Sequence, residues 1–151
     1  MAWSTLPELF DDAAAQLLAD CVQLGSAEEA RSAMSAMRAD DGGEVLAWLE
    51  GDTLVAVYGL RRNGPSFVMP WLAVDPAWRG KRYGRSALTD ALRRCGRSPM
   101  TVEADDGHVG WFQRVGFKIV GRKPLPGGGY RYRLGWYAPR RPDEPGYGAH
   151  G

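Results

Sequence analysis

The alternation of apolar and polar residues predicts two helices at the start of the chain. Apolar residues recur along one helical face from Leu6 to about Leu24, with Ser4 or Thr5 near the cap, and Gly25 ends that pattern. The segment Ser26-Ala27-Glu28-Glu29 is a capping box, and apolar residues at helical spacing follow it up to Asp40. The second helix is the better specified, because signals mark both of its ends.

Three strand-like runs follow and predict an antiparallel meander. The runs are Glu44–Glu50, Thr53–Arg61 and Ser66–Asp75. The first two are joined by Gly51-Asp52, a two-residue turn that suits a hairpin. Pro70 has no N–H to give to a neighbouring strand, so we expect a bulge within Phe67–Val74. A bulge would turn backbone groups out of the ladder, where they could bond a ligand.

The next segments predict a change from antiparallel to parallel pairing. A helical pattern runs from Gly84 to about Cys95 and lies between the third strand and a fourth, Met100–Asp105. A strand, helix, strand unit makes its two strands parallel, with a right-handed crossover. Ligands of open sheets bind at such switch points. A short helix near Gly107–Val115 and a hairpin of Phe117–Arg122 with Tyr130–Trp136 complete the predicted fold.

Composition indicates one globular domain. The 151 residues are 44% hydrophobic and carry a net charge of +1, which argues against a disordered or polyanion-coating chain. We expect a single domain at residues 1–138 and a disordered Pro- and Gly-rich tail at 139–151. The chain has neither an 18-residue apolar stretch nor a signal-peptide pattern, so we expect a cytoplasmic location and no membrane partner. Cys21 and Cys95 have no metal-ligand spacing; we interpret both as buried thiols on helix faces and expect no metal site.

Positive charge is concentrated around the turn before the third predicted helix. Seven basic residues and one acidic residue lie between Arg79 and Arg97, a local formal charge of +6. Free N–H groups and the helix dipole favour an anion at a helix N-terminus, and Gly80 and Gly84 allow a ligand to approach the backbone. The turn therefore predicts a phosphate site. Neither a P-loop nor a dinucleotide-binding spacing is present, which disfavours kinases, ATPases and dehydrogenases.

Three segments resemble the GNAT N-acetyltransferase superfamily, whose members transfer an acetyl group from acetyl-CoA to a primary amine. Leu72-Ala73-Val74-Asp75-Pro76 resembles the end of its fourth strand, and Arg79-Gly80-Lys81-Arg82-Tyr83-Gly84 resembles its pyrophosphate loop. Trp111-Phe112-Gln113-Arg114-Val115-Gly116-Phe117 is similar to its aromatic-Tyr-Glu-Lys-x-Gly-Phe segment. The likeness covers residues 44–136. It implies a mixed α/β (α+β) fold: a mostly antiparallel central sheet with one parallel β-α-β crossover, flanked by helices.

Four features depart from the family pattern. Arg82 stands where the loop has its middle glycine, which predicts a strained backbone at this position. Phe112 stands where many members have a tyrosine that protonates the leaving thiolate, so that role is vacant. Asp105 replaces a frequent asparagine near the pantetheine arm. The usual first strand is missing before the helices, which would leave a sheet edge open to a partner and allow a homodimer.

The resemblance also implies which residues hold the coenzyme. Backbone N–H groups near Leu72 and Val74 would bond the pantetheine arm and the acetyl oxygen, and the loop would hold the pyrophosphate. The implied coenzyme-binding set is Leu72, Ala73, Val74, Arg79, Gly80, Lys81, Arg82, Tyr83, Gly84, Arg85, Ser86, Asp105, Phe112 and Arg114.

The catalytic acid and base are left open. Glu103 is one candidate base, acting directly or through water, and an exposed strand position is its structural alternative. His108 is a second candidate base, with a surface or capping role as its alternative. Tyr58 and Tyr83 are the candidate acids, although a simple thiol with a pKa of about 8.5 can leave without one.

The sequence thus predicts an N-acetyltransferase in which an amine attacks acetyl-CoA directly within a ternary complex. Acetyl-CoA is the expected co-substrate, and the acceptor is an amine of a small molecule or a protein. A non-catalytic acyl-CoA or CoA sensor on the same fold is the alternative that Phe112 leaves open. A nucleic-acid-binding domain is disfavoured, because aromatic residues do not interleave with the basic ones and the whole chain is near neutral.

Overall fold

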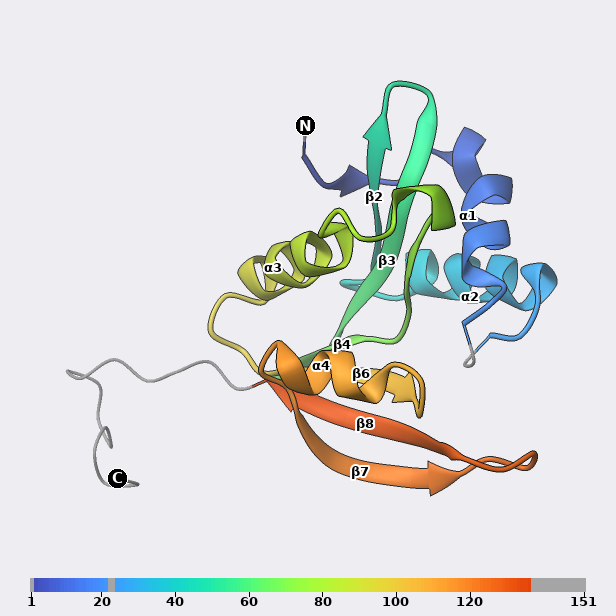
Figure 1. Ribbon diagram of the computed structural model, residues 1–151. Helices are drawn as coiled ribbons and strands as arrows, with labels where there is room; N and C mark the ends of the chain where they lie inside the picture. The colour runs from blue at the N-terminus through green and yellow to red at the C-terminus, as the bar shows by residue number, and fades with distance from the viewer. Residues whose placement is uncertain (1, 22–23, 137–151) are drawn as a thin grey trace.

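The computed structural model describes residues 2–21 and 24–136, which form a mixed sheet with helices on both faces (Figure 1). The strands are β1 (Ser4–Thr5), β2 (Glu44–Glu50), β3 (Thr53–Asn63), β4 (Ser66–Met69), β5 (Leu72–Val74), β6 (Met100–Asp105), β7 (Lys118–Pro124) and β8 (Tyr130–Trp136). The helices are α1 (Asp11–Leu18), α2 (Ala27–Ala39), α3 (Tyr83–Cys95) and α4 (Val109–Arg114), with short 3-10 turns at η1 (Glu8–Phe10) and η2 (Pro76–Trp78).

The sheet has the strand order β1-β2-β3-β4-β6-β8-β7, and β5 pairs with β3 beside this path. Of the pairs formed by the described strands, β4 with β6 is parallel and the others are antiparallel. Helix α3 connects the two parallel strands. The predicted meander, the single β-α-β crossover and the mostly antiparallel sheet are therefore confirmed.

A bulge at Pro70 divides the third predicted strand into β4 and β5. Arg61 faces Val68, and Tyr58 faces Leu72, so two residues of β3 lie opposite three residues of the other strand. Before the bulge, β4 pairs with β3 on one side and with β6 on the other, whereas β5, which follows the bulge, pairs with β3. The predicted bulge is confirmed, and it separates β5 from β6 at the switch point.

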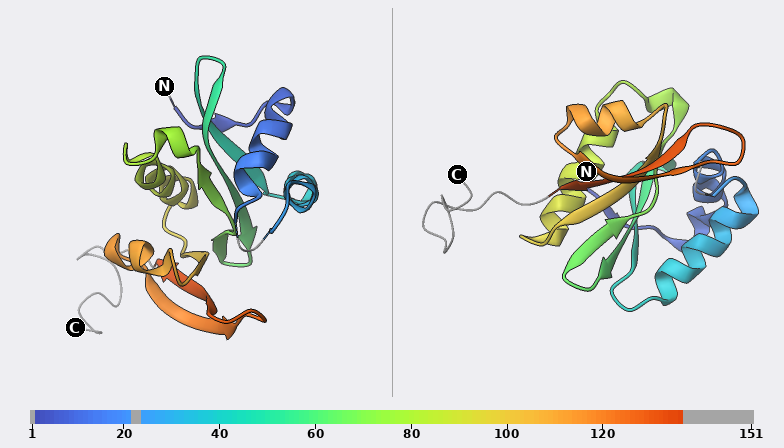
Figure 2. Two further views of the ribbon diagram at one scale, coloured as in Figure 1. Left: turned by 45° about the vertical axis from the view of Figure 1, so that its right-hand side comes forward. Right: turned by 90° about the horizontal axis from the view of Figure 1, so that it is seen from below.

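Helices α1 and α2 cover one face of the sheet, and α3 and α4 cover the other (Figure 2). The first face buries Leu18 and Met34 against Val57. The second face buries Leu88 and Phe112 in a cluster with strand residues that include Leu46, Tyr58, Met100 and Val102. Strand β3 contributes to both clusters, so it forms the centre of the core.

Local signals account for the ends of the two longest helices. The Ser26 hydroxyl accepts a 3.1 Å hydrogen bond from the Glu29 N–H, which confirms the predicted cap of α2. Helix α3 ends at Gly96, whose φ of 65° favours glycine.

The N-terminal segment differs from its prediction in two ways. A first strand is present, since Ser4 and Thr5 pair with Ala47 and Leu46 of β2. The prediction that the first strand is missing was wrong. A strand of two residues is too short to show an alternating pattern in the sequence. The helix expected from Leu6 to about Leu24 is also shorter, because Pro7 joins β1 to η1 and α1 ends at Leu18.

The two cysteines have different surroundings. Cys95 is buried in α3, as predicted, whereas Cys21 lies beyond the end of α1 and is partly exposed. The tail prediction for 139–151 lies outside the described residues. In residues 2–21 and 24–136, no helix has the length and apolar character needed to span a membrane.

Candidate functional site

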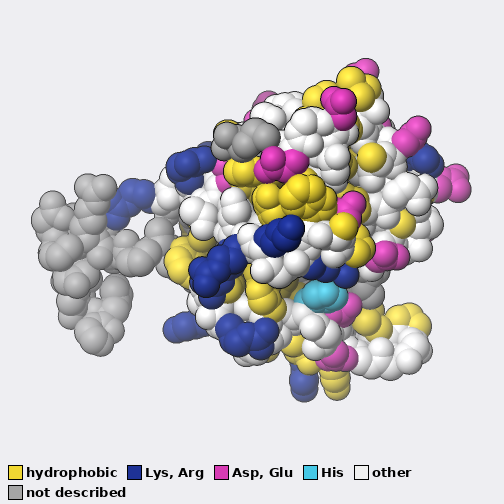
Figure 3. All heavy atoms as spheres, turned by 45° about the horizontal axis from the view of Figure 1, so that its top comes forward, with side chains coloured by type: hydrophobic (Ala, Val, Ile, Leu, Met, Phe, Trp, Pro, Cys, Tyr) yellow, Lys and Arg dark blue, Asp and Glu magenta, His cyan; other side chains and the backbone are white. Residues whose placement is uncertain are grey.

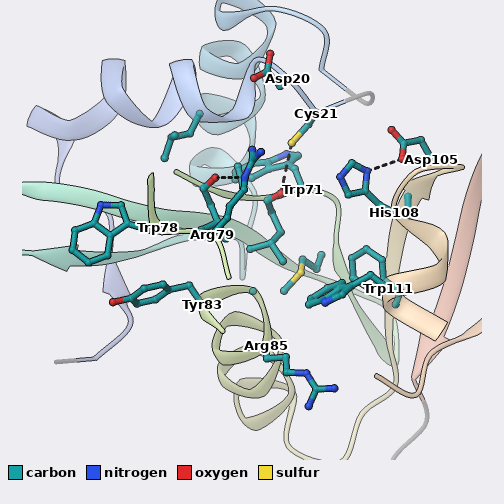
Figure 4. A pocket seen from close by; sticks show the side chains of 18 of the residues that line it. Asp20, Cys21, Trp71, Trp78, Arg79, Tyr83, Arg85, Asp105, His108 and Trp111 are labelled. Atoms are coloured by element: carbon teal, nitrogen blue, oxygen red, sulfur yellow. Dashed lines mark hydrogen bonds and ion pairs between the residues drawn. The ribbon is translucent and has the colours of Figure 1, made fainter. Parts of the chain in front are cut away.

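A cavity of about 810 Å³ opens where β5 and β6 separate. Its walls are the end of α1, strand β5, the turn before α3, the start of α3, strand β6 and helix α4. The lining residues are Leu17, Asp20, Cys21, Met69, Trp71, Leu72, Ala73, Val74, Trp78, Arg79, Gly80, Arg82, Tyr83, Gly84, Arg85, Glu103, Ala104, Asp105, His108, Trp111 and Phe112. We call this cavity the cleft. Side chains from both faces of the sheet meet in it (Figure 4).

One edge of β5 provides backbone groups to the cleft. Gly59 donates to the Trp71 carbonyl (3.1 Å) and Asp75 donates to the Val55 carbonyl (2.8 Å), which sets the hydrogen-bonded positions of the β3–β5 ladder. Alternate residues of an antiparallel strand point their N–H and C=O groups to opposite edges. The backbone groups of Leu72 and Val74 therefore point away from β3. The Leu72 carbonyl accepts a 3.7 Å hydrogen bond from the Cys21 thiol, which lines the cleft.

The turn before α3 has a conformation that glycine would adopt more easily. Arg82 has φ 69° and ψ 18°, and it is the one non-glycine residue with positive φ among those described. This backbone strain was predicted from the resemblance, in which Arg82 takes a glycine position. The first bond within α3 runs from the Ser86 N–H to the Arg82 carbonyl (2.9 Å). The N–H groups of residues 83–85 thus have no acceptor inside the helix.

Basic side chains surround this helix start. Arg79, Arg82 and Arg85 line the cleft, and Arg79 donates through Nε to the Val74 carbonyl (3.2 Å). On the face shown in Figure 3, Lys and Arg side chains gather mostly over one side of the molecule, and Asp and Glu side chains over the other. Unpaired N–H groups, the helix dipole and arginine side chains together suit an anion such as a pyrophosphate.

Three residues of the predicted coenzyme set lie outside the cleft lining. The Lys81 ammonium lies over the Trp78 ring, 5.0 Å from its centroid. The Ser86 hydroxyl accepts a 2.9 Å hydrogen bond from the Trp3 indole N–H on the other side of α3. Arg114 is at the C-terminal end of α4. The other eleven residues of that set all line the cleft.

The start of α3 and helix α4 pack against each other in the cleft lining. A Cβ placed on Gly84 would lie 3.2 Å from the ring of Trp111, which is tighter than ordinary van der Waals contact, so glycine at this position favours close packing of α3 against α4. Phe112 is 7% exposed and packs edge to face against Trp111 and Phe117. The Phe112 ring therefore occupies the expected tyrosine position without offering a proton.

Titratable groups gather at the end of the cleft that lies away from the basic start of α3. Glu103 on β6 forms a 2.9 Å ion pair with Arg131 of β8. Nδ1 of His108 lies 2.6 Å from Oδ1 of Asp105, and the His108 side chain is 74% exposed. Burial raises the pKa of the Cys21 thiol to about 11, which keeps the thiol protonated at neutral pH. Within residues 2–21 and 24–136, no cluster of His, Cys, Asp and Glu side chains could hold a metal ion.

Tyr58 lies in the core and not in the cleft lining. The Tyr58 hydroxyl donates a 2.5 Å hydrogen bond to Oδ2 of Asp90, a buried carboxylate of α3. Desolvation, and then the bond to Asp90, raise the pKa of Tyr58 well above its ordinary value. This geometry ties Tyr58 to the interior of the molecule, whereas Glu103 and His108 both face the cleft.

Several residues of the cleft lining were not predicted from the sequence as part of the site. Leu17, Asp20 and Cys21 come from the segment at the end of α1, far along the chain from the rest of the cleft. Their position depends on how α1 packs on β3 and β5, which no local pattern encodes. Trp71 and Trp78 flank the β5 segment and give the cleft aromatic walls.

Comparisons with known proteins agree on one family. The sequence matches the family described as acetyltransferase (GNAT) domain over residues 11–128. A stretch of 80 residues is 31% identical to an uncharacterized protein of Mycobacterium leprae (strain TN); it covers 48% of this chain and 22% of that protein. The chain thus spans less than a quarter of the length of this curated relative.

Solved structures share the fold at low sequence identity. An aminoglycoside 6'-N-acetyltransferase complexed with coenzyme A superposes with a TM-score of 0.79 and 15% identity, over 95% of this chain and 100% of that chain. The ribosomal-protein-S18-alanine N-acetyltransferase of Escherichia coli gives 0.74 and 12%, over 95% and 97%. A Bacillus subtilis acetyltransferase in complex with CoA gives 0.69 and 18%, over 91% and 99%.

Proposed function

The chain belongs to the GNAT acetyltransferase family, and we propose that it transfers the acetyl group of acetyl-CoA to a primary amine. The observation that carries the proposal is the cleft itself. Backbone groups of Leu72 and Val74 point away from β3 toward it, and a basic helix start lies at one end. Similar folds with bound coenzyme A support acetyl-CoA as the donor.

In the proposed complex, the coenzyme lies along the open edge of β5. The pyrophosphate lies against the N–H groups of residues 83–85, between Arg82 and Arg85. The pantetheine arm bonds the backbone of β5 as an added strand would, since Leu72 and Val74 direct polar groups to that edge. The thioester then lies near the end of the cleft that contains Glu103, Asp105 and His108.

The proposed reaction is direct attack by the amine within a ternary complex. An N–H group of β5 bonds the thioester oxygen and stabilises the negative charge that develops there during attack. Phe112 has no hydroxyl, so the thiolate leaves without a tyrosine acid at this position. The amine must lose a proton to a group of the cleft before it can attack.

The acceptor is proposed at the level of a primary amine. One protein of similar fold is an aminoglycoside 6'-N-acetyltransferase, and another is a ribosomal-protein-S18-alanine N-acetyltransferase. A small amine and a protein amino group therefore both suit this fold, and an amine panel should contain members of each class.

A non-catalytic coenzyme A sensor is the second candidate function. Phe112 favours it, because the ring fills the position of the tyrosine acid. Both candidate functions require coenzyme binding, so binding is tested first. At 100 times its dissociation constant, acetyl-CoA should raise the free energy of unfolding by about 2.7 kcal/mol.

Urea denaturation with acetyl-CoA, CoA and no ligand measures this effect. An increase with both ligands is the expected result. No increase with either ligand would exclude the transferase and the sensor together. Salt-sensitive binding of DNA or RNA by such a protein would instead favour the nucleic-acid function.

A further inference from the structure

A histidine and a carboxylate form a close pair inside the cleft. Nδ1 of His108, at the start of α4, lies 2.6 Å from Oδ1 of Asp105, the last residue of β6. Both residues line the cleft. In Figure 4 Asp105 is on one side of the His108 ring and the middle of the pocket is on the other.

This contact determines which ring nitrogen is available to a ligand. A carboxylate that accepts from Nδ1–H favours the tautomer with the proton on Nδ1. The neutral ring then has its free lone pair on Nε2. Because the two nitrogens are on different sides of the ring, Nε2 is directed away from Asp105.

We infer that His108, positioned by Asp105, is the base that removes the proton from the attacking amine. The inference rests on the proposed acetyl transfer and adds to it the identity of the proton acceptor. In this assignment His108 is a catalytic residue, because its Nε2 takes the proton directly from the substrate amine. Asp105 is a positioning residue, because it acts through the imidazole.

The other titratable groups around His108 are less suited to this role. On β6, Glu103 is engaged by the Arg131 guanidinium of β8 at 2.9 Å. Asp106, next to Asp105, accepts hydrogen bonds from the Tyr130 N–H and the Tyr132 hydroxyl. From the α1 side, the Cys21 thiol stays protonated and contacts the Leu72 carbonyl.

The remaining charged groups of the lining are Asp20, beside Cys21, and the arginines around the start of α3, which are Arg79, Arg82 and Arg85. Arginine stays protonated and cannot serve as a base. The Asp105–His108 pair thus combines a free acceptor nitrogen with a fixed orientation. Its exposure also lets the acquired proton pass to water.

The proposed step balances protons and electrons. Nε2 takes one proton from the substrate ammonium and becomes imidazolium, which the Asp105 carboxylate stabilises. The neutral amine forms the C–N bond at the thioester carbon, and the C–S bond breaks with its electron pair on the sulfur of CoA. The second amine proton goes to water or to the thiolate, and His108 returns its proton to solvent.

The test compares variants of the full-length protein with an amine that the wild type acetylates. His108→Gln should lower kcat/KM by about 100-fold or more and remove the limb of the pH profile that reports a histidine base. Affinity for acetyl-CoA should stay within threefold. Imidazole in the buffer should restore part of the activity of His108→Ala.

Two further variants separate the competing assignments. Asp105→Asn should lower kcat and shift the pH profile while His108 is still present. Glu103→Gln should cost less than His108→Gln. A His108→Gln variant with wild-type kcat/KM and pH profile would overturn the inference, as would a larger loss in Glu103→Gln together with no imidazole rescue.

An NMR measurement tests the Asp105–His108 pair without an amine substrate. His108 and His150 are the two histidines of the chain, so His108→Gln assigns the ring signals. We expect the neutral His108 ring to have its proton on Nδ1, and a proton on Nε2 would overturn the inference. A wild type that binds acetyl-CoA and acetylates no amine would overturn the proposed function and the base with it, whereas transfer that survives in His108→Gln overturns the base alone.

Discussion

The Tyr58 hydroxyl of β3 donates a 2.5 Å hydrogen bond to Oδ2 of Asp90 in α3, across 32 positions of the chain. Asp90 is 2% exposed and also pairs with Arg93 at 2.6 Å and Arg94 at 2.7 Å. Arg94 in turn donates to the Trp3 carbonyl at 3.2 Å. The central strand β3, the helix α3 that follows the basic turn (residues 79–82) and the N-terminal segment are thereby joined through one carboxylate.

Tyr58→Phe should therefore destabilise the protein without removing a catalytic acid. Loss of a buried hydrogen bond to a charged group costs about 1.5–3 kcal/mol. Urea denaturation should show that loss, while kcat at saturating substrate stays within threefold of wild type at a temperature where both proteins are folded. A large fall in kcat with unchanged stability would restore Tyr58 as a candidate acid.

Replacement of both Arg82 and Arg85 by alanine should weaken coenzyme binding by about tenfold or more, since charge-assisted bonds to phosphate are among the stronger ones. The matched control is Lys118→Ala with Lys123→Ala, which removes the same charge from exposed positions of β7. Isothermal titration with CoA measures both. Equal affinity in the two double variants would refute the role of the basic turn.

Arg82→Gly separates the backbone from the side chain at the same position. The left-handed conformation costs a non-glycine residue about 1–2 kcal/mol, and part of that gain is offset by the greater freedom of glycine in the unfolded chain. The free energy of unfolding of the free protein should rise by up to about 1 kcal/mol, while CoA affinity falls. Lower stability in Arg82→Gly would contradict the strain assigned to the turn.

The ion pair between α1 and α2 gives a pH-dependent contribution to stability. Arg38 donates to both carboxylate oxygens of Asp11, at 2.8 and 2.7 Å, and these bonds lower the pKa of Asp11. A lowered folded-state pKa stabilises the protein above the unfolded value of about 3.9, and the contribution is lost as the pH falls through the folded value. Since both side chains are partly exposed, Arg38→Ala should cost only about 0.5–1 kcal/mol at pH 7.

Denaturation of wild type, Arg38→Ala, Asp11→Asn and the double variant at pH 7 and at pH 3 checks this contribution. The coupling between the two residues should shrink at the lower pH. A coupling energy that does not change with pH would argue against a carboxylate as the partner of Arg38.

Much of the sheet could be predicted because its signals are local. Gly51-Asp52 sets the β2–β3 hairpin, and Pro70 sets the bulge that separates β5 from β6. The glycines and arginines of the basic turn predict the proposed anion site, because the glycines open the backbone to a ligand and the arginines add positive charge beside it. These local features include most of what forms the end of the cleft that we propose for the coenzyme.

The remainder depends on tertiary contacts that leave no periodic signal. A two-residue strand such as β1 is too short to alternate, and Cys21, which we expected on a helix face, lies beyond the end of α1 in the cleft lining. The bond between Tyr58 and Asp90 joins positions that no local rule connects. The pairing of Asp105 with His108 depends on the turn between β6 and α4.

The most direct measurement is the appearance of product with an amine panel. The wild-type protein is incubated with acetyl-CoA and a panel of small amines and peptides, and mass spectrometry follows each acceptor while a thiol reagent follows free CoA. The proposed function predicts an acceptor that gains one acetyl group, with an equal amount of CoA released above the protein-free control. Binding of acetyl-CoA with neither acetylated product nor released CoA would contradict an acetyltransferase and leave the coenzyme A sensor.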